Sequence, residues 1–216
     1  MDWANAIQLY IVLLISLTLH EAAHGLVAKI GGDRTAWDQG LVTANPAPHI
    51  RRSPLGMVVI PVFILLMSNG KLCFAGASAP INPDWASRFP RRAALMSLAG
   101  PVTNLLLAAI GFAALYWIGR PDPSSAWEPT FHQFMSIMFW LNLLLAIFNL
   151  LPLPPFDGAG VVCGVFLPAL RFYGYYVSFP LSSVISIVVA WRLLPYIFFP
   201  AYKWVGGFLP YPPSFG

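Results

Sequence analysis

Long stretches without a charged side chain constrain this sequence most. Three of them lie at 93–118, 131–151 and 172–191, and a fourth, from Trp3 to Ala28, carries only Glu21. About 20 apolar residues in a helix cross the roughly 30 Å hydrocarbon core of a bilayer. Because 58% of the residues are hydrophobic and only 9% are charged, the composition excludes an ordinary soluble domain. The sequence predicts an all-α polytopic membrane protein with roughly four to six transmembrane helices.

Local signals set the expected helix bounds. The first helix is expected at 7–30, before the stop at Gly31-Gly32. The second, at 93–118, is expected to be interrupted at Gly100-Pro101, and the third is expected to break at the prolines that follow residue 151. Beyond them lie a short apolar run, at 159–170, and the full-length run at 172–191.

The segment near residues 55–83 is expected to be re-entrant or irregular. Its apolar run, Leu55 to Met67, is short for a span and contains Pro61. A full crossing would also place Arg88, Arg91 and Arg92 on the opposite side from the basic residues of the preceding loop, against the positive-inside rule. The stretch 72–83, rich in Gly, Ala and Pro, is expected to be non-helical backbone. The slightly longer stretch 70–83 could pair with the opened strand of a substrate helix.

The chain is predicted to form a single integral-membrane domain, residues 1–216, without internal repeats. Its net charge of +4 comes from basic residues beside apolar runs, where they suit the surface of a lipid bilayer. Nucleic-acid binding is therefore not expected. Cys73 and Cys163 are too few for a disulfide framework or a cysteine metal site.

The sequence His20-Glu21-Ala22-Ala23-His24 carries the clearest chemistry. Histidines at i and i+4 lie on one helix face, close enough for both imidazoles to bind one Zn²⁺, while the glutamate can reach a zinc-bound water. The alternative is that the histidines only hydrogen-bond between helices and that Glu21 is a buried ion-pair partner. Three polar residues on an apolar helix make that alternative costly.

Asp157 is the natural third ligand, since a catalytic zinc takes three protein ligands and keeps one position open. It follows a proline-rich segment that ends the preceding helix, which we expect to leave extended backbone able to bring the carboxylate toward the first helix. On its own, Asp157-Gly158 would be interpreted as a turn, because Asp-Gly is a common turn pair. Beside the paired histidines, the interpretation as a ligand is favoured.

Three motifs together resemble the site-2 protease family of intramembrane metalloproteases. They are the histidine motif at 20–24, the sequence A-G-P-V-T-N at 99–104 and N-L-L-P-L-P-P-F-D-G at 149–158, and they occur in the expected order within hydrophobic segments. The resemblance covers roughly residues 7 to 160. It leaves no room for a PDZ domain between the motifs or for a pair of CBS modules after Asp157, so a minimal member is expected.

The resemblance implies roles for individual residues. Zn²⁺ would be held by His20, His24 and Asp157, with Glu21 as general base and Asn149 positioning the substrate or intermediate. Asn104 matches the asparagine of the middle motif, although a hydrogen bond between helices explains it equally well.

The implied activity is hydrolysis of peptide bonds in or near transmembrane helices of membrane protein substrates, in regulated intramembrane proteolysis. The expected location is a prokaryotic plasma membrane. The alternative is a non-proteolytic zinc-binding membrane protein, such as an inactive homologue, a scaffold or a transporter. A transporter would be expected to show repeats or further intramembrane charges. His49 and His132 fall outside the motifs and are interpreted as structural or interfacial.

Overall fold

The computed structural model describes residues 2–71, 73, 79–179 and 181–211, and within them the only regular structure is helical. Among these described residues, four helices are long and apolar enough to cross a membrane, or five if one bent pair is counted as a span. This confirms the predicted all-α polytopic membrane protein. In chain order the elements are α1 (Trp3–Gly31), α2 (Thr35–Asp38), α3 (Pro46–Arg52), η1 (Leu55–Val59), α4 (Ile60–Met67), α5 (Pro83–Arg88), α6 (Pro90–Ile118), α7 (Glu128–Asn149), α8 (Asp157–Val165), α9 (Pro168–Val177) and α10 (Ser182–Gly206).

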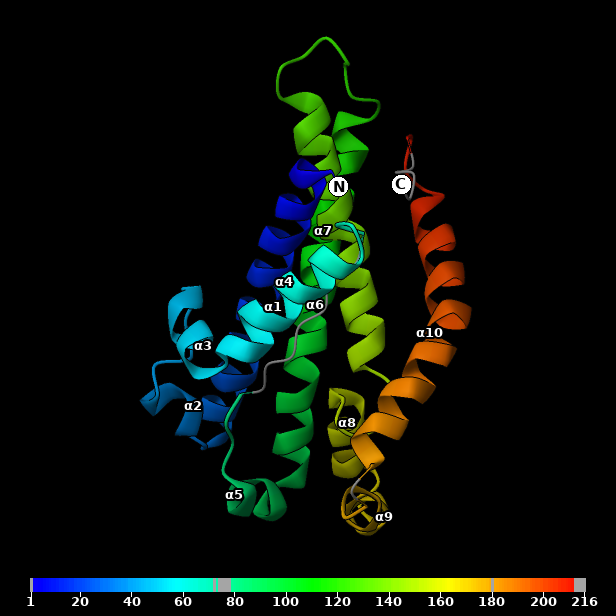
Figure 1. The fold of residues 1–216 in the computed structure, drawn as a ribbon. Coiled ribbons are helices and arrows are strands. Elements are labelled where there is room, and N and C mark those ends of the chain that lie inside the picture. The colour runs from blue at the N-terminus through cyan, green and yellow to red at the C-terminus, as the bar shows by residue number, and fades with distance from the viewer. Residues whose placement is uncertain (1, 72, 74–78, 180, 212–216) are drawn as a thin grey trace.

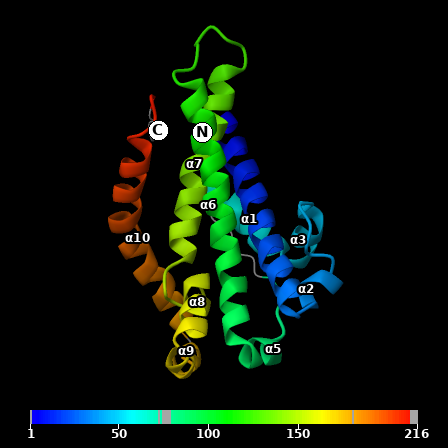
Figure 2. The same cartoon turned by 180° about the vertical axis from the view of Figure 1, so that it is seen from behind.

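Helices α1, α6 and α7 lie side by side and form the centre of the bundle (Figure 1). Helices α6 and α7 form an antiparallel hairpin, whereas α10 lies at the edge, as the view from behind also shows (Figure 2). Of the four candidate spans, α1 is the most buried and α10 the least. The helix that carries the histidine motif is therefore shielded from lipid by its neighbours.

The predicted helix at 172–191 is wrong. That run is divided between α9, which ends at Val177, and α10, which begins at Ser182 and continues through Arg192, Pro195 and Pro200 to Gly206. The run without charged residues ends before Arg192, which suggested that the helix ends there too. A long arginine side chain can, however, extend along an apolar surface to reach the polar interface. A charge near the end of a span is therefore tolerated.

The predicted interruption of the second helix at Gly100-Pro101 is also wrong. Helix α6 runs unbroken from Pro90 to Ile118, with Pro101 buried inside it. Proline removes one backbone hydrogen bond, and within a membrane bundle neighbouring helices and local hydroxyl groups compensate for that loss. The hydroxyl of Thr103, two residues beyond Pro101, donates to the carbonyl of Ala99 at 2.9 Å within the same helix, whereas the carbonyl that loses its backbone donor to the proline is that of Ser97.

A re-entrant segment is present where it was expected. Helix α3 and the continuous η1–α4 helix are bent by 111° relative to each other. The described elements α3 and α5 both lie beside the half of the bundle in which α1 ends and α6 begins (Figure 1). Half of the predicted irregular stretch at 72–83, namely residues 72 and 74–78, lies outside the described residues.

The C-terminal end of α1 is tied to α5 and α6. The carbonyl of Gly31 accepts hydrogen bonds from Trp85 Nε1 and from the Arg92 guanidinium, both at 3.0 Å. Asp33 accepts from Thr35 and from the backbone N–H of Asn82. Burial opposes ionisation of Asp33, but these hydrogen bonds outweigh it and lower its pKa. These contacts fix the axial position of α1 against α6.

Helix α8 packs closely on the N-terminal part of α6 because it presents glycines there. A Cβ at Gly160 would overlap Ser97, and one at Gly164 would overlap Ala94 and the carbonyl of Pro90. Small residues at spacings of four allow such close contact between membrane helices. This packing places Asp157, the first residue of α8, beside α6.

Gly164→Ala is expected to destabilise the protein by about 1–3 kcal/mol, since the added methyl group meets backbone that cannot move away. Thermal unfolding in detergent measures the effect as a lower midpoint. Gly174→Ala in α9 is the matched control, because a Cβ there would meet no atom of the described residues within 4 Å. Equal midpoints for the two variants would contradict the close packing of α8 on α6.

Candidate metal centre

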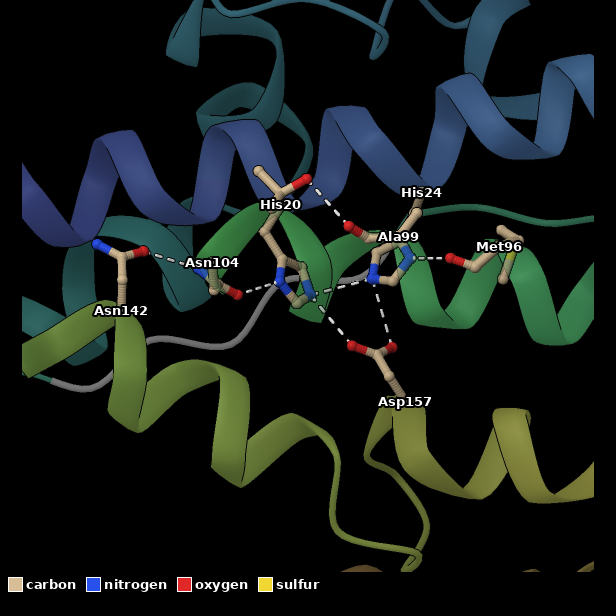
Figure 3. Close-up of polar contacts among 8 residues, drawn as sticks. His20, His24, Met96, Ala99, Asn104, Asn142 and Asp157 are labelled. Atoms are coloured by element: carbon tan, nitrogen blue, oxygen red, sulfur yellow. Dashed lines mark hydrogen bonds and ion pairs between the residues drawn. The ribbon is translucent and has the colours of Figure 1, made fainter. Parts of the chain in front are cut away.

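His20 and His24 lie one turn apart on α1 and are buried, with 5% and 4% of their surfaces exposed. Their Nε2 atoms are 3.0 Å apart. Both side chains point from α1 toward α6 and α8 (Figure 3). The i, i+4 spacing therefore places the two imidazoles together, as the sequence predicted.

The Nδ1 atom of each imidazole is hydrogen-bonded to a carbonyl oxygen. His20 Nδ1 lies 2.6 Å from Asn104 Oδ1, and His24 Nδ1 lies 2.7 Å from the backbone carbonyl of Met96. Since both oxygens only accept hydrogen bonds, a neutral imidazole must carry its proton on Nδ1. The lone pairs on both Nε2 atoms then face the same point, which favours a cation there.

The carboxylate of Asp157 completes the cluster. Its Oδ2 atom lies 3.2 Å from His20 Nε2, and its Oδ1 atom lies 3.3 Å from His24 Nε2. Three ligands bound tetrahedrally to zinc at about 2.0–2.1 Å would lie about 3.3 Å apart. The three ligand atoms lie within 4.8 Å of one another, and the donor set of two imidazoles and one carboxylate fits zinc.

The segment between α7 and α8 delivers Asp157 to this position. It was expected to be extended, but it is a series of turns, with the N–H of Phe156 donating to the carbonyl of Leu153 at 2.9 Å. Phe156 packs on Phe148, with ring centroids 4.5 Å apart. Its prolines prevent regular helix but allow turns, so the chain folds back sharply and α8 begins at Asp157.

Gly100 provides the space that the histidines occupy. A Cβ at this position of α6 would overlap the Nε2 atoms of both His20 and His24. The sequence marked Gly100 only as a helix break, because a single glycine gives no sign of what lies against it. In the folded protein its missing side chain lets α1 and α6 approach at the cluster.

Glu21, next to His20 on α1, is 5% exposed. Its carboxylate interacts electrostatically with His20, His24 and Asp157, and also with His49. Its Oε2 atom has no hydrogen-bond partner among the described residues. A buried carboxylate oxygen without a protein partner is available to a small ligand such as water.

The remaining residues singled out in the sequence lie at varying distances from the cluster. Asn104 contacts it directly through His20. Asn149 ends α7, half-buried, and none of the described contacts joins it to the ligands. His49 is buried in α3, with Nε2 3.3 Å from the carbonyl of Thr43. His132 is buried near the start of α7, on the opposite end of that helix from Asn149.

Comparison with known proteins identifies the relationship. The family model described as peptidase family M50 matches residues 117–172, which include α7, the turn segment and Asp157. The chain is 38% identical to "Putative zinc metalloprotease YwhC" of Bacillus subtilis, over 76% of this chain and 71% of that protein. The chain belongs to peptidase family M50. The region matched by the family model contains the motif at 149–158, and membership of family M50 confirms the predicted resemblance to the site-2 proteases.

Two further relatives with the same kind of name support the assignment to family M50. MJ0611 of Methanocaldococcus jannaschii is 32% identical over 73% of this chain and 72% of that protein. Rip2 of Mycolicibacterium smegmatis is 31% identical over 69% of this chain, which spans only 53% of that relative. No solved structure matches the chain.

Proposed function

We propose that this M50 protein is an intramembrane zinc metallopeptidase that hydrolyses peptide bonds in or near transmembrane helices of other membrane proteins. The observation that carries the proposal is the convergence of His20, His24 and Asp157, beside the carboxylate of Glu21, inside a bundle of membrane-length helices. Metal-assisted hydrolysis needs three protein ligands, an open coordination position and a base. The names of the relatives support zinc as the metal.

Each residue of the cluster has a role in this mechanism. His20, His24 and Asp157 would hold Zn²⁺, which supplies Lewis acidity toward the scissile carbonyl and the attacking water. Glu21 accepts a proton from that water through Oε2, which has no hydrogen-bond partner in the described part of the chain, and then delivers it to the leaving amine. The carbonyl oxygens that accept hydrogen bonds from the two Nδ1 atoms keep both imidazoles oriented during the reaction.

The peptide is proposed to approach from the side of Asp157. The Asp157 side chain is 22% exposed, whereas those of the two histidines are 6% exposed. Asn149, which precedes the turn segment leading to Asp157, would position the substrate there. A substrate helix hides its amides in internal hydrogen bonds, so several residues must unwind before a carbonyl reaches the cluster.

The bundle is an integral membrane protein, and we propose a prokaryotic plasma membrane as its location. Basic residues gather on the loops, on the short helices and in the first turn of α6, in the part of the bundle where α1 ends and α6 begins: Arg34, Arg51, Arg52, Arg88, Arg91 and Arg92. By the positive-inside rule this end faces the cytoplasm. The sequence relatives come from bacteria and an archaeon, which supports this location.

The purified protein in detergent is expected to cleave at least one of a panel of single-span helical substrates. A zinc chelator should reduce cleavage to the level of the protein-free blank, and one equivalent of Zn²⁺ should restore it, because zinc supplies the Lewis acid. Gel analysis and mass spectrometry of the products measure cleavage, and metal analysis measures zinc. Bound zinc without cleavage of any substrate would favour the non-proteolytic alternative, and absence of zinc would refute the proposal.

A further inference from the structure

We propose that Asn142 of α7 is a positioning residue that sets the orientation of His20 through the side chain of Asn104. This inference rests on the proposed zinc site and goes beyond it, because Asn142 touches neither the ligand atoms nor the base. Asn104 and Asn142 are completely buried, with 0% exposure. They form a chain of hydrogen bonds that begins on α7 and ends at the His20 imidazole (Figure 3).

The chain of hydrogen bonds begins at the backbone carbonyl of Met138, whose hydrogen-bonding role is fixed. Asn142 Nδ2 lies 2.9 Å from the backbone carbonyl of Met138, which can only accept a hydrogen bond. The amide NH₂ group of Asn142 must therefore face Met138, and its Oδ1 atom must face away. That oxygen lies 2.9 Å from Asn104 Nδ2. The carbonyl of Met138 therefore fixes which end of the Asn142 amide is oxygen and which is nitrogen.

The same argument fixes the next two groups. Asn104 must donate through Nδ2 to the oxygen of Asn142, so its own Oδ1 atom faces His20. His20 must then donate through Nδ1, and its Nε2 lone pair is left free for the metal. If the Asn104 amide were reversed, its NH₂ group would face His20, the imidazole proton would move to Nε2, and the ligand would be blocked.

His24 shows why His20 needs this support. The Nδ1 atom of His24 is held by the carbonyl of Met96, a backbone group that cannot rotate. His20 is held by a side-chain amide, which presents an acceptor in one orientation and a donor in the other. Asn142 removes that ambiguity, so the two histidines present their Nε2 atoms in the same way.

Hydrogen bonding between helices is the competing explanation, because Asn104 of α6 and Asn142 of α7 also join two helices. The two explanations differ in what a substitution changes. A purely structural contact affects thermal stability, whereas an orienting contact affects zinc affinity and depends on the amide at position 104 having two unlike ends. A carboxylate at position 104 has two acceptor ends, so its orientation would no longer matter.

The test measures zinc affinity by chelator competition in detergent for four proteins. Asn142→Leu is expected to weaken binding by about 10–100-fold, the usual effect of losing a group that orients a ligand. Adding Asn104→Asp to that variant should restore most of the affinity, because either carboxylate oxygen accepts from His20 Nδ1. Ser136→Ala is the control: it removes a buried hydroxyl of α7 that bonds within its own helix, and it should bind zinc like the wild type.

The cobalt-substituted proteins provide a second readout, since the visible spectrum of Co²⁺ reports the ligand set without catalysis. The spectrum of Asn142→Leu should change and that of the double variant should return toward the wild type. Where leucine impairs folding, Asn142→Ala replaces it. Wild-type affinity in Asn142→Leu, or no recovery in the double variant, would overturn the inference while leaving the zinc site intact. A wild-type protein that binds no zinc would overturn the proposed function and this inference with it.

Discussion

Replacing Glu21 by glutamine is expected to reduce peptide hydrolysis by roughly 100-fold to 10,000-fold, the usual contribution of a general base. The carboxamide has nearly the same shape and remains beside His20 on α1, but it cannot take a proton from the attacking water. Since Glu21 is not a proposed ligand, zinc content should stay at one equivalent. Cleavage rates at saturating substrate and metal analysis of the same preparation measure the two effects separately.

Glu128→Gln is the matched control, because it makes the same chemical change at the other glutamate of the chain. Glu128 begins α7 and accepts a hydrogen bond from the backbone N–H of Asp122, at the opposite end of that helix from the site. Wild-type activity is expected for this variant. Full activity in Glu21→Gln would contradict the base role, and loss of zinc from it would instead indicate that Glu21 helps to hold the metal.

The ligands could be predicted from the sequence because their geometry is mostly local. His20 and His24 share a helix face at any position in any helix, so the motif fixes their separation once the segment is helical. Asp157 is distant in sequence, so its role as a ligand could be predicted only by assuming that folding brings it to the histidines. The cost of an unpaired carboxylate deep in an apolar region supported that assumption. The structure brings the three together as expected, although the segment before Asp157 turns where extended backbone was predicted.

The surroundings of the site could not be predicted, because they depend on contacts between helices. Asn142 occurs in an apolar run with no motif around it, and only the packing of α7 on α6 shows that it meets Asn104. The carbonyl of Met96 is a backbone group, and its contact with His24 leaves no trace in side-chain pattern. The same limit explains the errors at Pro101 and Arg192. Local rules predict that a proline or a charge ends a helix, but contacts within the membrane bundle allow α6 and α10 to continue through these residues.

Gly100→Ala is expected to weaken zinc binding by at least about 100-fold, the upper end of what loss of a supporting group costs. The added methyl group would overlap the Nε2 atoms of both His20 and His24. Neither imidazole can move away easily, because each is buried and held through Nδ1. Chelator competition measures the affinity, and thermal unfolding of the metal-free protein measures the cost to folding.

Gly111→Ala separates these two effects, because it makes the same change on the same helix away from the cluster. Its Cβ would meet the backbone of α7 at Met135 and Phe139, so we expect a lower unfolding midpoint, by about 1–3 kcal/mol in free energy. Its folded fraction should bind zinc like the wild type. If both glycine variants lost zinc equally, the loss would reflect general loosening of α6, and Gly100 would have no specific role at the metal. Loss confined to Gly100→Ala would instead mean that the glycine of the middle motif serves to admit two metal-binding side chains from the neighbouring helix.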